Sequence, residues 1–199
     1  MQESSKNKGD PNSPQNRGEN TKANKEIKKN VCNKSGTALT GVTDASLADN
    51  PDNRRSSCGY AWYINGGVVS FKATQQTVVA LSSCEAEYMG ACLAIKQGAH
   101  LKMMLAELGF PQDCVLLYTD NSANIDYSIN DRISPRTAHI DTRFHFVKDK
   151  IKAREFELYY LNTESIPADA LTKSLDATRH LRHAESLQNQ RIQFRSSKQ

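Results

Sequence analysis

Residues 80 to 90 read Ala80-Leu81-Ser82-Ser83-Cys84-Glu85-Ala86-Glu87-Tyr88-Met89-Gly90, and this stretch decides the fold. Ser82 precedes Glu85 by three residues, which is the spacing of a capping box. In that motif the serine oxygen accepts a backbone N–H and the glutamate reaches back to the cap. The stretch therefore predicts the start of a long helix, which we expect from about Ser83 to Leu108. Glu85 has a structural role at this helix start, whereas Glu87 has no obvious one.

Small residues follow Glu87 at helical spacing. Ala91, Ala94 and Gly98 recur three or four positions apart, so they share a helix face with Glu87. Such a face lets a helix lie close to a sheet, and it would direct Glu87 toward that sheet. Gly109-Phe110-Pro111 ends the pattern.

Strand patterns flank the long helix on both sides. The expected strands are 38–45, 59–64, 68–72, 115–119 and 156–161. The further expected helices are 122–129, 140–153 and a last one that is capped by Ser165 and has Pro167 in its first turn. This order predicts an α/β fold with a five-stranded mixed sheet, three antiparallel strands followed by two parallel ones, and helices on both faces.

Composition divides the 199 residues into a body and two basic, polar ends. We predict a disordered leader over 1–36, one domain over 37–175, and a tail over 176–199 that is partly helical or disordered. Basic ends suit contact with a polyanion, although solvated disorder is the commoner meaning of such tails. Because the sequence has no membrane-spanning apolar run and no signal core, we expect an intracellular protein, cytoplasmic or nuclear, without a membrane partner. Five scattered cysteines show no zinc-binding spacing, which favours reduced thiols.

Four acids stand near the ends of the expected elements. Asp44 and Asp120 close the first and fourth strands, Glu87 lies early in the long helix, and Asp169 lies in the first turn of the last helix. If the first and fourth strands are neighbours, Asp44 and Asp120 lie within reach of one another. Carboxylates so close repel each other unless divalent cations lie between them. Oxygen ligands without Cys or His favour Mg²⁺ or Mn²⁺, and two such ions can support phosphodiester hydrolysis.

Each acid also has an ordinary structural interpretation. Asp44 suits a turn and Asp120 suits an Asx cap. Glu87 suits a solvent-facing helix position, and Asp169 suits the positive end of a helix dipole. Spacing alone leaves these alternatives open.

Six short motifs follow one another along the chain. They are Thr43-Asp44-Ala45, Arg54-Arg55-Ser56-Ser57-Cys58-Gly59-Tyr60, the stretch 80–89 quoted above, Tyr118-Thr119-Asp120-Asn121, Arg136-Thr137-Ala138-His139-Ile140-Asp141-Thr142-Arg143-Phe144-His145-Phe146 and Ala168-Asp169-Ala170-Leu171-Thr172-Lys173. Together they resemble the ribonuclease H domain of copia-type (Ty1/copia, Pseudoviridae) retrotransposon Pol polyproteins. The resemblance covers roughly residues 38 to 175.

The resemblance implies an RNase H-like fold and a metal-dependent endonuclease that cuts the RNA strand of an RNA–DNA hybrid, as part of a retrotransposon reverse transcriptase. The catalytic and metal-binding residues would be Asp44, Glu87, Asp120 and Asp169. The cofactor would be two Mg²⁺ ions, with Mn²⁺ as the alternative, and no small-molecule cofactor is implied. The partners would be the hybrid and the polymerase part of a parent polyprotein, since this chain has no Tyr-x-Asp-Asp polymerase motif.

Candidate nucleic-acid contacts accompany these acids. Arginines suit phosphates, and serines at the helix start suit the 2′-hydroxyls of RNA, although Ser82 is needed for the cap. The two histidines lie six residues apart and have a packing or loop-bracing role as their alternative. The candidates are Arg54, Arg55, Ser83, Asn121, Arg136, His139, Arg143 and His145.

The sequence departs from the family pattern at several positions. Ser46 and Leu47 stand where the family has an Asp-Trp pair, Ser122 replaces a glutamine, and Ala138 replaces a lysine. Residues 161–167 contain no histidine, so we expect slower turnover than in cellular ribonucleases H. Two other functions stay open. One is a catalytically decayed retroelement fragment that only binds nucleic acid. The other is a different nuclease of this fold, such as an integrase, but that family needs a helix glutamate as its last acid, and this sequence has Asp169 there.

Overall fold

The computed structural model describes residues 38–123, 125 and 141–188. Five strands form one sheet in the order β3-β2-β1-β4-β5. Their bounds are β1 Leu39–Ser46, β2 Ser57–Ile64, β3 Gly67–Gln75, β4 Val115–Thr119 and β5 Phe156–Tyr160. The first three are antiparallel, whereas β4 runs parallel to β1 and β5 parallel to β4. The predicted sheet is confirmed.

The first strand is longer than its sequence pattern indicates. β1 continues to Ser46, so Asp44 lies within the strand, opposite Gly59 of β2, and does not end it. Asp120 follows directly after β4, as predicted. Because β1 and β4 are parallel neighbours, the two acids lie near each other toward the carboxyl ends of these strands.

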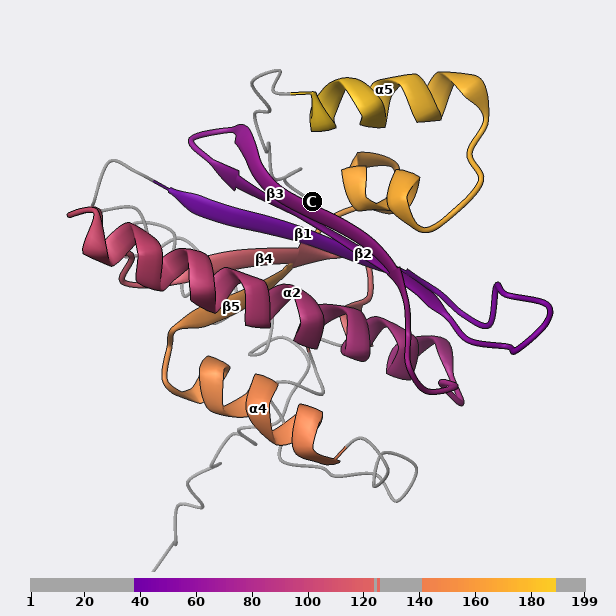
Figure 1. Cartoon of the computed structure of the whole chain (residues 1–199), viewed down its shortest axis with the longest axis horizontal. Coiled ribbons are helices and arrows are strands. Elements are labelled where there is room, and N and C mark those ends of the chain that lie inside the picture. Colours follow the sequence, from indigo (N-terminus) through magenta and orange to yellow (C-terminus); the bar gives the residue numbers. More distant parts are fainter. Residues whose placement is uncertain (1–37, 124, 126–140, 189–199) are drawn as a thin grey trace, which may run out of the picture.

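Helices cover both faces of the sheet (Figure 1). α2 (Ser83–Glu107) and α4 (Asp141–Lys152) lie on one face, over the larger apolar core. The short helix η3 (Pro167–Leu171) and α5 (Ala177–Leu187) lie on the other face, over a smaller apolar cluster that includes Val42, Tyr63 and Ile166.

The small-residue face of α2 lies against the sheet, as predicted. Ala91 and Ala94 are fully buried. The indole N–H of Trp62, on β2, donates a hydrogen bond of 3.1 Å to the carbonyl of Ala94. A Cβ atom at Gly98 would lie 2.4 Å from the Trp62 ring, and one at Gly41 of β1 would lie 2.6 Å from it. The ring therefore fits only because both neighbours are glycines.

The prediction of a single last helix after β5 is wrong. In place of one helix capped by Ser165, the chain makes two short 3₁₀ helices, η2 (Thr163–Ser165) and η3. The side chain of Asn162 caps η2, and Ser165 is its final residue. Pro167 begins η3, as predicted, but Ile166 precedes it and supplies no side-chain cap.

The tail that follows Leu175 begins with a three-turn helix. The side chain of Asp176 accepts the N–H of Arg179 at 3.0 Å and so caps α5. Of the predicted helix over 122–129, Ser122, Ala123 and Ile125 are helical, and the remainder lies outside the described residues. The predicted leader and the far end of the tail also lie outside them. Within the described ranges, no helix has the length and apolar character needed to cross a membrane.

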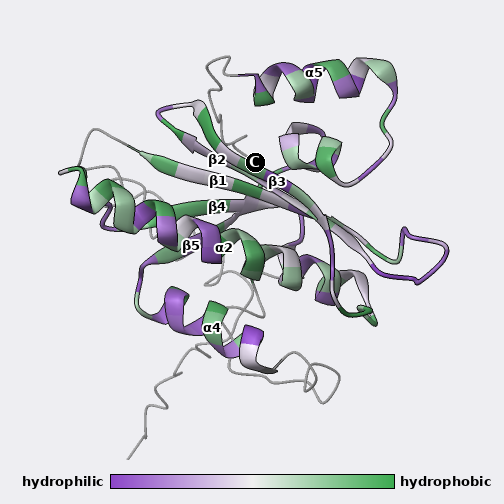
Figure 2. Cartoon of the chain, viewed as in Figure 1, coloured by the Kyte–Doolittle hydropathy of each residue, from purple (hydrophilic) through white to green (hydrophobic). Residues whose placement is uncertain are grey.

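The loop between β1 and β2 carries the predicted arginines. Arg54 and Arg55 are both exposed there. Figure 2 shows this loop as a hydrophilic segment that projects from the end of the sheet.

Candidate metal centre

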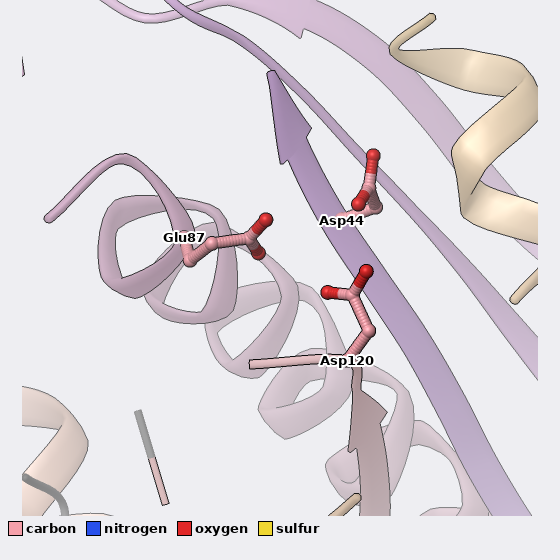
Figure 3. A group of neighbouring side chains, drawn as sticks. All are labelled: Asp44, Glu87 and Asp120. Atoms are coloured by element: carbon pink, nitrogen blue, oxygen red, sulfur yellow. The ribbon is translucent and has the colours of Figure 1, made fainter. Parts of the chain in front are cut away.

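Three acids from three elements meet at one edge of the sheet. Asp44 comes from β1, Glu87 from the first turns of α2, and Asp120 from the end of β4. One carboxylate oxygen of each lies within 4.8 Å of the others. Figure 3 shows the three side chains around a common space. We call this group the acidic trio.

The helix start fixes the position of Glu87. Ser82 accepts the N–H of Glu85 at 3.2 Å, as predicted. Glu85 accepts the N–H of Leu81 at 2.8 Å, one residue before the cap, so the glutamate turns back to the helix start. Glu87 then reaches β1, where its Oε1 accepts the N–H of Ala45 at 3.2 Å.

The second oxygen of Glu87 has no protein partner. The side chain is 6% exposed, and Oε2 is buried without a hydrogen bond among the described residues. A buried carboxylate oxygen in this state costs free energy unless a cation or donor reaches it. The trio therefore offers an open acceptor where an ion would lie.

Two threonines and a lysine hold the aspartates. Thr163 donates to Oδ2 of Asp120 at 2.8 Å. Thr172 donates to Oδ2 of Asp44, and Lys173 lies 3.1 Å from Oδ1 of the same residue. These contacts come from the segments around η2 and η3, so the second face of the sheet completes the site.

Asp169 lies beside the trio and is not one of its members. Its Oδ1 lies 2.7 Å from Nζ of Lys173, and its Oδ2 lies 3.0 Å from Nη2 of Arg179. Lys173 thus joins Asp169 to Asp44. The sequence predicted a group of four acids. In the structure three of them form the trio, and the fourth, Asp169, forms ion pairs with the side chains of Lys173 and Arg179.

A close approach at Gly59 brings η3 to this position. A Cβ atom at Gly59 would lie 2.7 Å from Cβ of Leu171. Since Gly59 is the register partner of Asp44, η3 is held against the strand beside that acid.

Burial and mutual repulsion dominate the electrostatics of the trio. Burial raises the pKa of Glu87 to about 9, and the charges of Asp44 and Asp120 add to the effect. Burial also raises the pKa of Asp44 to about 6, against the opposing hydrogen bond from Thr172 and the charge of Lys173. Burial alone would lower the pKa of Lys173, but its hydrogen bond to Asp169 and the charge of Asp44 raise it. The buried carboxyl groups of Glu87 and Asp44 thus resist ionisation without a cation, and the trio's oxygens could hold a metal ion.

The candidate nucleic-acid contacts differ in how exposed their side chains are. Ser83 is exposed at the first residue of α2, and His145 is exposed on α4. Asn121 follows Asp120 and is partly buried. Arg143 instead hydrogen-bonds Thr77 at 3.2 Å and contacts the sulfur of Met89 at 3.0 Å. Arg136 and His139 lie outside the described residues.

Sequence reasoning missed the partners of the acids. Lys173 belongs to the last motif, but only the structure shows that it bridges two carboxylates. Thr163 and Arg179 carry no sequence signal, because their contacts depend on how η2, η3 and α5 pack.

Comparisons with known proteins agree with this geometry. No family model matches the sequence. Over 135 residues the chain is 40% identical to the retrovirus-related Pol polyprotein from transposon TNT 1-94 of Nicotiana tabacum, a match that covers 68% of this chain and 10% of the relative. It is 28% identical over 142 residues to the Pol polyprotein from transposon RE1 of Arabidopsis thaliana, which covers 71% of this chain and 10% of that relative. The chain is a homologue of copia-type Pol polyproteins.

The Pol homologue spans about a tenth of the length of these curated relatives. Among solved structures it is similar to LC11-RNase H1 in complex with an RNA/DNA hybrid, with a TM-score of 0.51 and 13% identity, over 67% of this chain and 93% of the other. At that identity the likeness concerns the fold alone. The Pol homologue therefore has an RNase H-like fold, as the sequence predicts.

Proposed function

We propose that this Pol homologue is a metal-dependent endonuclease that cleaves the RNA strand of RNA–DNA hybrids, as the RNase H part of a copia-type reverse transcriptase. The observation that carries the proposal is the acidic trio, whose oxygens lie within 4.8 Å of one another at the edge of an RNase H-like sheet. Copia-type Pol relatives support the same assignment.

Asp44, Glu87 and Asp120 would hold one divalent ion, and Asp44 with Asp169 would hold a second. Mg²⁺ is the expected ion and Mn²⁺ the alternative, because all donors are carboxylate oxygens. When bound, such ions lower the pKa of water and stabilise charge on a phosphodiester. The orphan Oε2 of Glu87 and the raised pKa of this residue fit that role.

The chain's own residues orient this site before any substrate arrives. Ala45 holds one oxygen of Glu87 through its N–H, and Thr163 holds one oxygen of Asp120. Thr172 fixes the rotamer of Asp44 from the opposite face of the sheet. Each of these bonds fixes one carboxylate oxygen, and Lys173 contacts the second oxygen of Asp44.

The hybrid would contact the surface around the trio. Exposed Arg54 and Arg55 suit phosphates, and exposed Ser83 suits a 2′-hydroxyl. Asn121, His145, Arg136 and His139 are proposed as further contacts. Arg143 is also proposed as a contact, and its hydrogen bond to Thr77 and its contact with Met89 tie α4 to α2 and to the segment before it. The polymerase part of a parent polyprotein is the proposed protein partner, and an intracellular location stays a prediction.

Cleavage of a labelled RNA–DNA hybrid tests the proposal. With Mg²⁺ we expect fragments of the RNA strand only, and no fragments after chelation. Asp120→Asn should lower the rate at least about 100-fold, because it removes a charged ligand from the trio. Asp113→Asn, the same chemical change at an exposed position before β4, should cleave like the wild type.

Two outcomes would overturn the enzyme assignment. Equal fragment release by the wild type and Asp120→Asn would show that the trio is not responsible. Hybrid binding without cleavage in Mg²⁺ or Mn²⁺ would favour the decayed, binding-only fragment.

A further inference from the structure

The side chain of Lys173 lies between two buried carboxylates. Its Nζ is 3.1 Å from Oδ1 of Asp44 and 2.7 Å from Oδ1 of Asp169. The two aspartate side chains are 0% and 1% exposed, whereas that of Lys173 is 34% exposed. One ammonium group thus contacts two buried carboxylates and offsets one of their two negative charges.

The other side of the site has no such cation. Among the ion pairs of the described residues, none involves Glu87 or Asp120. The four acids carry four negative charges when ionised, and Lys173 and Arg179 offset two of them beside Asp169. A divalent ion in the acidic trio would offset the remaining two. The charges therefore balance with one divalent ion in place and Lys173 still bound.

We propose that Lys173 occupies the position of the second divalent ion in the metal-free protein, so that the two ions bind in a fixed order. The inference rests on the proposed function, because it takes the acids as metal ligands. The acidic trio binds its ion first. The pair formed by Asp44 and Asp169 binds an ion only when the Lys173 side chain leaves. Lys173 is thus a positioning residue that sets the affinity of the second site.

The contacts around Lys173 allow an ion to replace its ammonium group. Lys173 follows η3 and is partly open to solvent, so its flexible side chain can turn outward and recover its hydration. Arg179 contacts Oδ2 of Asp169, which leaves Oδ1 as the oxygen that Lys173 vacates. Thr172 contacts Oδ2 of Asp44, which likewise leaves Oδ1. The same two oxygens would pass from the ammonium to the ion.

Calorimetric titration of the full chain with Mn²⁺ tests the order of binding. The wild type should show a tight step and a weaker one. Lys173→Met removes the competing charge, so the weaker step should tighten by at least about tenfold, while the tight step changes less than about twofold. Lys173→Arg keeps a cation and should retain the weak second step.

Thermal unfolding gives a second, independent measurement. Without metal, Lys173→Met should unfold at a lower temperature than the wild type, since Asp44 and Asp169 lose their shared cation. Saturating Mn²⁺ should restore most of that loss. Lys173→Gln, which keeps a polar side chain, is titrated in parallel so that the result does not depend on the folding of one variant.

Other results would distinguish the role of Lys173 from the proposed endonuclease function. An unchanged second step in both Lys173→Met and Lys173→Gln would overturn the role of Lys173, even if the wild type cleaves hybrids. Tightening of the second step in a protein that cleaves no hybrid would support the role of Lys173 and overturn the proposed function.

Discussion

Glu85 and Glu87 lie two residues apart on α2 and differ in what they contact. Glu85 turns back to the N–H of Leu81 and closes the helix start. Glu87 points across to β1 and keeps one buried oxygen that no described residue contacts through a hydrogen bond. The capping spacing alone separates these roles, which is why the sequence already identified the second glutamate as the candidate ligand.

Paired substitutions test whether Glu85 caps the helix and Glu87 binds the metal ion. Glu85→Gln should cleave hybrids at a rate within about threefold of the wild type, because an amide oxygen can also accept the Leu81 N–H. Glu87→Gln should lose at least about 100-fold, because it removes a charged metal ligand. Hybrid cleavage rates, with circular dichroism as the folding control, measure both. Similar losses in the two variants would contradict the division.

Glu87 also predicts how stability depends on pH when metal is absent. Its pKa rises from an ordinary value of 4.5 to about 9 in the folded protein. The folded state therefore holds a proton that the unfolded state releases, so stability falls as pH rises between these values. Asp44 acts in the same direction up to a pH of about 6. Burial lowers the pKa of His183, which acts in the opposite direction below its ordinary value of 6.5.

The comparison with Glu87→Gln isolates the glutamate. In chelator, the free energy of unfolding of the wild type relative to Glu87→Gln should decrease by about 4 kcal/mol from pH 5 to pH 8. Urea denaturation at several pH values measures this difference. A difference that does not vary with pH would contradict the raised pKa of Glu87.

At the scale of elements, α2 packs closely on the sheet around the ring of Trp62. The Trp62 ring fills the space left by Gly98 and Gly41, and Ala91 and Ala94 complete the contact. The sequence predicted this close approach from the spacing of small residues. It did not predict which side chain fills the space, because that depends on the pairing of β1 with β2.

A pair of glycine substitutions on α2 tests the contact. Gly98→Ala would place a Cβ 2.4 Å from the rigid Trp62 ring, so we expect a loss of stability on the order of 2 kcal/mol. Gly90→Ala is the matched control, because its Cβ meets nothing closer than 3.4 Å and alanine favours the helix. Urea midpoints compare them. Equal midpoints for the two variants would contradict the close packing.

Among the described residues, the helices that sequence reasoning misjudged lie after β5. The prediction that Ser165 is a helix cap is wrong. Asn162 caps the 3₁₀ helix η2 instead, and Pro167 begins the second 3₁₀ helix, η3. Helix α5 was hard to foresee, because its sequence is polar and only His183 is deeply buried. Its position over η3 follows from tertiary contacts that no local pattern encodes.

At the scale of the whole molecule, the sheet order explains how much could be predicted. Strand patterns and the adjacency of β1 and β4 were sufficient to bring Asp44 and Asp120 together. Residue spacing on α2 directed Glu87 toward the sheet, and the resemblance to copia-type motifs selected it as a ligand over its structural alternative. The surroundings of Asp169 were not predictable, since Lys173 and Arg179 reach it from a short helix and a tail helix whose placement depends on the finished sheet.

Truncation tests what the tail adds to the domain. A chain ending at Leu175 lacks Arg179 and the buried His183. It also lacks Leu187, which packs against the smaller apolar cluster. We expect it to lose on the order of 2–4 kcal/mol of stability relative to a chain ending at Gln188. Urea denaturation of the two truncated chains measures the difference. Identical midpoints would show that α5 is dispensable for folding.

Trp62 gives the molecule a built-in optical probe. It is the single tryptophan of the chain, it is fully buried, and its indole is hydrogen-bonded to α2. Its fluorescence should therefore shift to longer wavelength when α2 separates from the sheet and water reaches the ring. Because the trio's oxygens lie at the edge of the sheet, away from this ring, loading the site with ions or hybrid should leave the emission nearly constant. One spectrum would then distinguish a variant that has lost its fold from one that has lost only its chemistry.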